Sequence, residues 1–163
     1  SPDLPFGLGS GAAAIYGVTG GVAEAVVRYC VPDKSKNALR SVRVTDLRGD
    51  GAIREVHLTI EGQELHIAIV NGLIHAKELI ADIEAGKRFY HLVEVMTCQG
   101  GCVGGAGQPY GLSDVKQKRK QGLYDTDASA LFKRAEKNPI VTSLLEKYGE
   151  EKCHELLHVH YGE

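Results

Sequence analysis

The sequence lacks the features that mark several large classes of protein. Its 163 residues carry a net charge of −2 and a pI near 6.4, without the basic surplus that a nucleic-acid binder shows. No apolar run approaches the roughly 18 residues that span a membrane, and no segment has the pattern of a signal peptide. Internal repeats are also absent. We therefore expect a soluble globular protein without nucleic-acid or membrane partners.

Cysteine is scarce and irregularly placed. The four cysteines, Cys30, Cys98, Cys102 and Cys153, do not form the regular pattern of a disulfide framework. In a reducing compartment such a set serves metal binding or catalysis more often than bridging. The sequence therefore directs attention to thiol chemistry.

Alternating apolar residues predict the strands. The alternation over 56–60 and 65–69, on either side of Glu61 and Gly62, predicts a β-hairpin in which His57 faces His66. Alternation also predicts a strand over 40–46. A near-continuous apolar run predicts a strand over 89–96 that is covered on both faces, as in a parallel or mixed sheet.

Helical spacing predicts two helices in the first half of the chain. One runs over 20–29 with Thr19 as its N-cap, and the other runs over 73–85 with Gly86 as its C′ residue. The glycine-rich entry around Gly17 lacks the dinucleotide and phosphate fingerprints, although a helix N-terminus there could meet some other ligand.

The C-terminal third is predicted to be helical. Helices are expected to begin at Ser113 or Asp114, at Asp125 or Asp127, and at Asn138-Pro139, and the basic run over 116–120 predicts a solvated helix face. We therefore expect an α/β fold in one domain over 1–163. It should contain a small mixed sheet flanked by helices and a helical C-terminal third.

The stretch MTCQGGCVGGAGQP, residues 96–109, carries the clearest chemistry. Cys98 and Cys102 follow the predicted strand in a loop rich in glycine, which lets the backbone approach a bulky group closely. Thiolates are the ligands that iron–sulfur clusters require. A zinc ribbon or a thioredoxin-like pair would need two intervening residues, and a disulfide would leave the glycines unexplained. Two cysteines cannot complete a four-thiolate cluster, so further ligands must come from elsewhere.

Two histidine patterns offer other metal sites. His154-Glu155-x-x-His158 matches the zincin pattern, with Glu155 as the general base, but it lacks an evident third ligand because His160 lies on the other side of a helix. A terminal helix whose histidines cap or pack is the simpler interpretation. His57 and His66 could also bind a metal, but the sequence shows no third ligand, so a solvated pair is again simpler.

The loop closely resembles the third cluster-binding motif of the iron-only (FeFe) hydrogenases, which is close to MACPGGCxxGGGQP. Residues 11–25, 68–73, 122–127, 138–139 and 154–161 also resemble family segments and follow in the family's order. The resemblance covers residues 6–161 and identifies the C-terminal half of the large-subunit catalytic domain. It also makes His154-Glu155-x-x-His158 a family-typical structural terminus.

The resemblance implies an H-cluster, in which a 4Fe-4S cubane is joined to a two-iron unit where hydrogen is oxidised or formed. Cys98 would ligate the cubane, and Cys102 would ligate it and bridge to the two-iron unit. Met96, Tyr16 and Gly17 would line the cofactor pocket. The other ligands and the proton-relay residues belong to the N-terminal half of the catalytic domain, so this chain alone is expected to be inactive, without a complete cluster.

The resemblance also implies a ferredoxin-like electron carrier as partner and a cytoplasmic location, with the periplasm as the alternative. The loop departs from the family pattern at Thr97, Gln99 and Ala106, and Tyr16 and Ala23 replace a phenylalanine and a methionine. Hydroxyl groups near the cluster would add hydrogen-bond donors, which favours a sensory or weakly active subgroup as a hypothesis. The competing functions are a non-catalytic iron–sulfur assembly factor and, more remotely, a zinc hydrolase.

Overall fold

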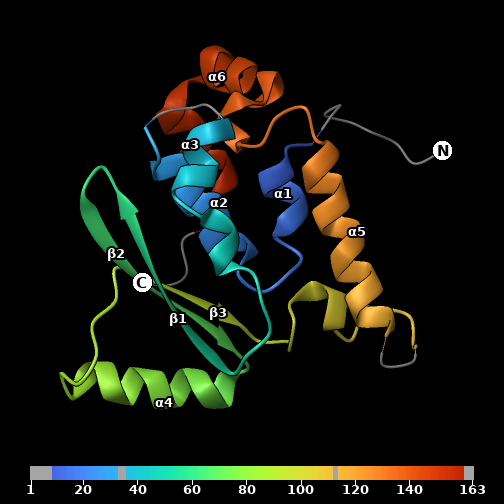
Figure 1. The fold of residues 1–163 in the computed structure, drawn as a ribbon. Coiled ribbons are helices and arrows are strands. Elements are labelled where there is room, and N and C mark those ends of the chain that lie inside the picture. Colours follow the sequence, from blue (N-terminus) through green and yellow to red (C-terminus); the bar gives the residue numbers. More distant parts are fainter. Residues whose placement is uncertain (1–8, 33–35, 112–113, 160–163) are drawn as a thin grey trace.

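A three-stranded mixed sheet forms the centre of the computed structural model, which describes residues 9–32, 36–111 and 114–159 (Figure 1). Strand β1 (Ile53–Ile60) pairs antiparallel with β2 (Gln63–Asn71), and β3 (Leu92–Met96) pairs parallel with β2. Helix α4 (Leu73–Glu84) makes the crossover between the two parallel strands, as a parallel connection requires.

The β1–β2 hairpin has the predicted register. Leu58 lies opposite Leu65, and His57 lies opposite His66. The two-residue turn places Glu61 at φ 50° and Gly62 at φ 81°, both in the left-handed region that a type I′ turn needs. Local alternation and a local turn thus determine this part of the fold, and the prediction is confirmed.

Helices cover both faces of the sheet. On one face α2 (Gly21–Cys30), α3 (Lys36–Ser41) and the 3₁₀ helix η1 (Val44–Leu47) enclose the larger core. On the other face Ala76 and Leu79 of α4 pack against Ala68 and Val70 of β2. The predicted α/β class, with helices flanking a small mixed sheet, is confirmed. Helix α4 also ends as predicted, with Gly86 at φ 68°.

The predicted strand over 40–46 is wrong. Helix α3 continues to Ser41, Arg43 adopts the left-handed conformation at φ 59°, and η1 begins at Val44. A strand cannot pass through a left-handed residue without a break. The apolar residues at 42 and 44 still enter the larger core, where Val44 is buried, but a 3₁₀ turn takes them there.

The strand predicted over 89–96 is shorter and less covered than expected. It begins at Leu92, and β3 is an edge strand of the three-stranded sheet. Val93 and Val95 are 37% and 44% exposed, whereas Glu94 between them is buried. The prediction that both faces are covered is therefore wrong within the described residues. The apolar side of this edge faces solvent.

The C-terminal region packs through α5 (Val115–Ser129), which lies beside the short helix α1 (Gly11–Ile15) (Figure 1). The predicted helix start at Asp125 or Asp127 is wrong because both residues lie within α5. Asp127 turns into a buried group of ion pairs and does not cap a helix. Asp114 precedes α5 without a side-chain capping bond, and Ser113 lies outside the described residues.

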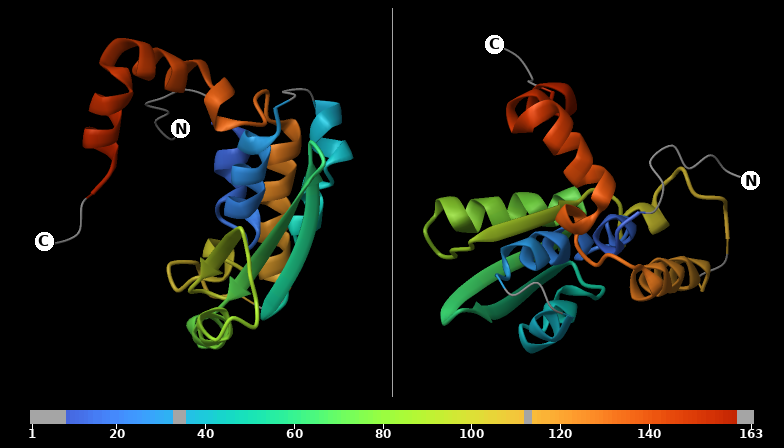
Figure 2. Two further views of the ribbon diagram at one scale, coloured as in Figure 1. Left: turned by 90° about the vertical axis from the view of Figure 1, so that its left-hand side faces the viewer. Right: turned by 90° about the horizontal axis from the view of Figure 1, so that it is seen from above.

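Helix α6 (Pro139–Leu157) begins as predicted. The side chain of Asn138 accepts a hydrogen bond of 3.0 Å from the amide of Ile140, and Pro139 occupies the first helical position. A non-helical Gly149 divides α6, which extends away from the sheet (Figure 2). The short 3₁₀ helix η3 (Ala135–Lys137) precedes α6. Within the described residues, no helix has the length and apolar character to cross a membrane.

Candidate cluster-binding site

The two cysteines of the glycine loop lie just beyond the carboxyl end of β3. Cys98 follows the last strand residue by two positions, and Cys102 opens the 3₁₀ helix η2 (Cys102–Gly104). Both thiols are free and exposed. The structure thus presents two exposed thiols beyond one edge strand of the sheet, and their role as metal ligands stays a prediction.

The backbone of the loop is held against residues 17–19. The amide of Thr19 donates to the carbonyl of Gly100 at 3.2 Å, and the amide of Val103 donates to the carbonyl of Gly17 at 3.2 Å. Gly101 lies between these bonds at φ 86°, where a Cβ atom would come within 2.7 Å of the Gly17 oxygen. Only glycine fits this crossing of two chains. Gly17 therefore lies beside the cysteine loop, and its expected place in the wall of a cofactor pocket stays a prediction.

A second glycine leaves room at the thiols. A Cβ atom on Gly105 would stand 3.6 Å from the sulfur of Cys98 and 3.3 Å from the carbonyl oxygen of Cys102. A larger side chain at this position would therefore occupy space beside the Cys98 sulfur. Soft donors on a nearly bare loop match the donor set and the steric clearance that an iron–sulfur cluster needs. The residues present fit two of its ligands.

Asn71, at the end of β2, fixes the entry to the loop. Its side-chain oxygen accepts hydrogen bonds from the Thr19 hydroxyl at 2.6 Å and from the Gly100 amide at 3.2 Å. Its amide nitrogen donates to the Gly51 carbonyl at 2.6 Å. The predicted role of Thr19 as a helix N-cap is therefore wrong, because its hydroxyl is committed to Asn71 and Gly20 is the N-cap of α2.

Glu94 of β3 takes the place of a local cap on α2. Its carboxylate accepts hydrogen bonds from the amides of Gly20 at 2.6 Å and Ala23 at 2.7 Å. Burial raises the pKa of Glu94 above its ordinary value, and the bonds from the backbone amides offset only part of that shift. The chain's own carboxylate therefore occupies this helix N-terminus, where the sequence left room for an external ligand.

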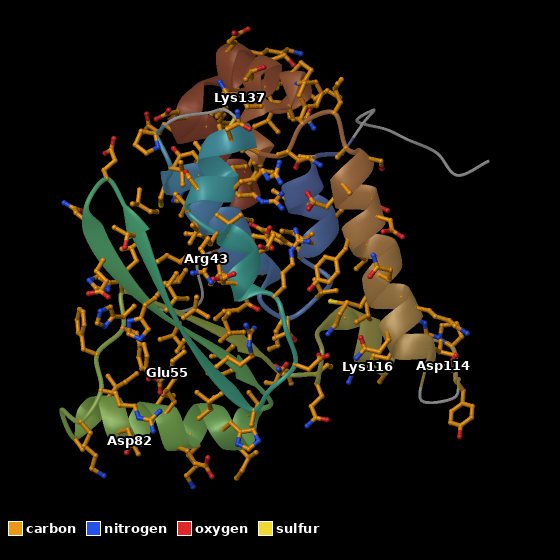
Figure 3. The ribbon with its side chains drawn as sticks, in the orientation of Figure 1. Arg43, Glu55, Asp82, Asp114, Lys116 and Lys137 are labelled. Carbon is orange, nitrogen blue, oxygen red and sulfur yellow. The ribbon has the colours of Figure 1, made fainter. Side chains whose placement is uncertain are left out.

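The basic run at the start of α5 is tied to the loop. The stem of Lys116, labelled in Figure 3, lies 2.5 Å from where a Cβ atom on Gly100 would be and 3.3 Å from where one on Gly104 would be. Arg119 donates to the Pro109 carbonyl at 2.6 Å, and the buried Lys120 forms an ion pair with Asp50. The prediction of a purely solvated helix face is therefore wrong. Two of its five residues, Lys116 and Arg119, contact the loop, and Lys120 pairs with Asp50 before β1.

Met96 and Tyr16, the other expected lining residues, lie at element ends. Met96 is the partly buried last residue of β3, and its carbonyl accepts a 2.6 Å hydrogen bond from the Gly72 amide. Tyr16 follows α1 and is 50% exposed, in a surface hollow that Val26 and Tyr29 also line. Met96 therefore immediately precedes the cysteine loop. Tyr16 immediately precedes Gly17, whose carbonyl accepts the hydrogen bond from Val103 of that loop.

The His154-Glu155-x-x-His158 pattern gains no support as a zinc site. The rings of His154 and His158 stack 4.2 Å apart, and Glu155 pairs with Lys152 at 2.7 Å. Across residues 9–32, 36–111 and 114–159, the single group of three potential metal ligands within mutual reach is instead His57, Glu64 and His66. His160 lies outside the described residues.

The comparison with protein families decides which family the chain belongs to. Residues 1–106 match the C-terminal domain of the iron-only hydrogenase large subunit. The chain belongs to the iron-only hydrogenase family. Residues 113–163 match the iron hydrogenase small subunit, so the two matched segments together reach from α1 to the last helix. The resemblance seen in the sequence is confirmed.

Known hydrogenases agree with the chain over nearly its whole length. It is 41% identical over 98% of its residues to the NADP-reducing hydrogenase subunit HndD of Solidesulfovibrio fructosivorans, of which it covers 28%. It matches a structure of the [FeFe]-hydrogenase HydA1 from Chlamydomonas reinhardtii at TM-score 0.65 and 31% identity, covering 98% of this chain and 48% of that one. A cytosolic iron-sulfur assembly component of Bos taurus is 32% identical over 89% of the chain, which covers 31% of it. The chain thus spans less than a third of these curated relatives and about half of the solved hydrogenase.

Proposed function

We propose that residues 1–163 form the C-terminal lobe of a hydrogenase catalytic domain in which Cys98 and Cys102 ligate the H-cluster. The observation that carries the proposal is the pair of exposed free thiols on a glycine loop bonded to residues 17–19. Hydrogen oxidation or proton reduction is the reaction that a complete domain of this family would perform.

The ligand roles follow the resemblance residue by residue. Cys98 would ligate the cubane, Cys102 would ligate the cubane and bridge to the two-iron unit, and Tyr16, Gly17 and Met96 would line the pocket. When bound, the H-cluster supplies the iron chemistry that interconverts hydrogen with protons and electrons. The residues of this chain would contribute two thiolate ligands and a backbone crossing at Gly101 that fixes their loop.

The exposed apolar surface supports a second lobe as partner. Leu73, Ile74 and Ile80 of α4 are 60%, 64% and 53% exposed, and Val93 and Val95 lie open at the free edge of β3. Exposed apolar side chains on a helix and on an unpaired strand edge are typical of surfaces that another segment covers. We propose that the N-terminal half of the catalytic domain, with the remaining ligands and the proton-relay residues, covers it. A ferredoxin-like carrier and a cytoplasmic location are proposed from the family resemblance.

A non-catalytic iron–sulfur assembly factor is the second candidate function. Its support is the 32% identity to the assembly component of Bos taurus and the departures at Thr97 and Gln99 in the ligand loop. The terminal segment 154–161 resembles the hydrogenases and favours the first candidate. Infrared spectroscopy separates the two, because only an H-cluster gives bands from bound carbonyl and cyanide.

The test uses the complete, matured protein that contains this chain. We expect iron and sulfide in cluster stoichiometry, carbonyl and cyanide bands, and hydrogen turnover. Cys98→Ser or Cys102→Ser should abolish the bands and the activity, whereas Cys30→Ser, at an exposed cysteine that ends α2, should leave both unchanged. Full activity in the Cys102→Ser protein would refute the proposed ligand role.

The isolated chain gives an independent check. Because it offers only two thiolates in its loop, iron and sulfide reconstitution should give less than a full cluster. A stable cluster of full iron content in this chain alone would contradict the proposal that further ligands come from a second lobe.

A further inference from the structure

A second group of potential ligands lies on the β1–β2 hairpin. His57 projects from β1, and Glu64 and His66 project from the same face of β2, since they are two residues apart and His66 is directly opposite His57. The Nδ1 of His57 is 3.9 Å from one oxygen of Glu64, and the Nε2 of His66 is 3.5 Å from the other. All three potential ligand atoms lie within 4.8 Å of one another. Glu64 is the third ligand that the sequence pattern did not reveal.

The hairpin holds this group in place through its backbone. The strand register fixes the spacing of the facing Cβ atoms, and the two-residue turn at Glu61-Gly62 fixes the register. A tetrahedral zinc with ligands at about 2.1 Å places its donor atoms about 3.4 Å apart. The observed separations of 3.9 and 3.5 Å run to the two different oxygens of Glu64, so the side chains must rotate to bring both imidazole nitrogens and the carboxylate around one ion.

The surroundings favour a borderline-soft cation. Two imidazoles and one carboxylate suit zinc and its neighbours, whereas magnesium and calcium prefer oxygen ligands alone. His66 is additionally flanked by His91, whose Nδ1 accepts a 3.0 Å hydrogen bond from the His66 amide and whose ring lies edge-on to the ring of His66 at 5.6 Å. The hydrogen bond orients the ring of His91, which therefore lies beside the ring of His66.

We propose that His57, Glu64 and His66 bind a divalent zinc-class cation on the hairpin, with water completing its coordination. The ion would link β1 to β2 near the middle of the hairpin. The site is separate from the cysteine loop, because Asn71, which contacts that loop, lies five residues along β2 from His66, or about 17 Å of extended strand. It therefore adds a second metal to the chain, independent of any cluster.

The test is a zinc titration of the full 163-residue chain carrying Cys98→Ser and Cys102→Ser, so that the loop thiolates cannot compete. Calorimetry and equilibrium dialysis should show one saturable zinc per chain. Loss of a residue that merely orients a metal ligand costs about 10- to 100-fold in affinity, so His57→Gln, Glu64→Gln or His66→Gln should each weaken binding at least about tenfold.

Matched variants identify the site. His75 lies 3.4 Å from Glu78 on α4 and offers a two-ligand pair of similar exposure, so His75→Gln should leave zinc affinity unchanged. His158→Gln tests the stacked pair on α6 in the same way. The hairpin positions are at least partly exposed, and far-UV circular dichroism checks that their variants fold. Absence of saturable binding, unchanged affinity in Glu64→Gln, or loss of binding only in His158→Gln would each overturn the proposal without affecting the one for Cys98 and Cys102.

Discussion

Replacing the buried Asp127 with asparagine should destabilise the chain more than the same replacement of an exposed aspartate on α5. Asp127 of α5 accepts two hydrogen bonds of 2.8 Å from Arg28 and one of 2.9 Å from Arg48, and its side chain is 6% exposed. Glu24 completes the group through bonds of 2.6 Å to Arg28 and 2.7 Å to Arg48. Two guanidinium groups thus balance two carboxylates between α2 and α5.

The size of the effect follows from the burial of these charges. Breaking a buried pair by removing one partner costs about 3–5 kcal/mol, because an unbalanced charge is left behind. Glu24 still contacts both arginines in Asp127→Asn, so we expect the lower end, about 3 kcal/mol. For a chain of this length that corresponds to a drop in Tm of about 6–12 °C.

The acid dependence gives this prediction a second signature. Burial alone would raise the pKa of Asp127, but the hydrogen bond and charge of Arg28, with the charges of Lys133 and Arg48, lower it below its ordinary value. A lowered folded-state pKa means that the stabilisation is fully present above the unfolded pKa and is lost as the pH falls through the folded one. The difference between wild type and Asp127→Asn should therefore shrink below about pH 4.

Urea denaturation of the 163-residue chain, followed by circular dichroism at several pH values, measures both effects. Asp125→Asn is the matched control, because Asp125 is exposed on the same helix and its side chain accepts a hydrogen bond of 2.8 Å from the exposed side chain of Gln121. It should change the free energy of unfolding by no more than about 0.5 kcal/mol. A loss below about 1 kcal/mol in Asp127→Asn at neutral pH, or one that persists unchanged at pH 3, would refute the reasoning.

Three further predictions concern the loop and the way the two family segments join. Gly101→Ala should cost more than about 1 kcal/mol in urea denaturation, because of its positive φ and the Gly17 contact, whereas Gly107→Ala, with open space around it, should be neutral. A colorimetric thiol reagent should modify Cys30, Cys98 and Cys102 rapidly and the buried Cys153 slowly; four equally fast thiols would contradict the packing of α6. Residues 1–111 and 112–163, coexpressed as two chains, should copurify through α1, α2 and α5, and Asp127→Ala should disrupt that association; equal recovery of both pairs would contradict the role of the ion pairs.

The parts of the fold that could be predicted depend on neighbours in the sequence. The β1–β2 hairpin follows from alternation and a two-residue turn, and the start of α6 follows from Asn138-Pro139. The strand predicted over 40–46 failed because a single left-handed residue, Arg43, redirects the chain, and no local pattern marks an arginine for that conformation. Here tertiary packing of Val44 overrides the periodicity.

The candidate site divides in the same way. Cys98 and Cys102 could be found because their chemistry and spacing are local, and the resemblance added Gly17. Asn71 and Glu94 could not be found, since they act on residues more than fifty positions away in the chain, at Thr19 and Gly20. Glu94 even lies within an apolar run that suggested uniform burial of hydrophobic side chains, and it is the one residue of β3 that the chain buries fully.

The proposed second lobe has to cover the exposed side of β3 and also reach the cysteine loop. Val93 and Val95 pair with Ala68 and Val70, so they lie on the α4 face of the sheet and at its free edge. Cys98 follows Val95 by three residues along the same segment. A partner that buries the two valines therefore reaches to within about 10 Å of extended chain from Cys98. Hydrophobic docking at the edge of β3 and delivery of the remaining cluster ligands would then be a single event, so a charge placed at Val93 should weaken lobe association and cluster retention together.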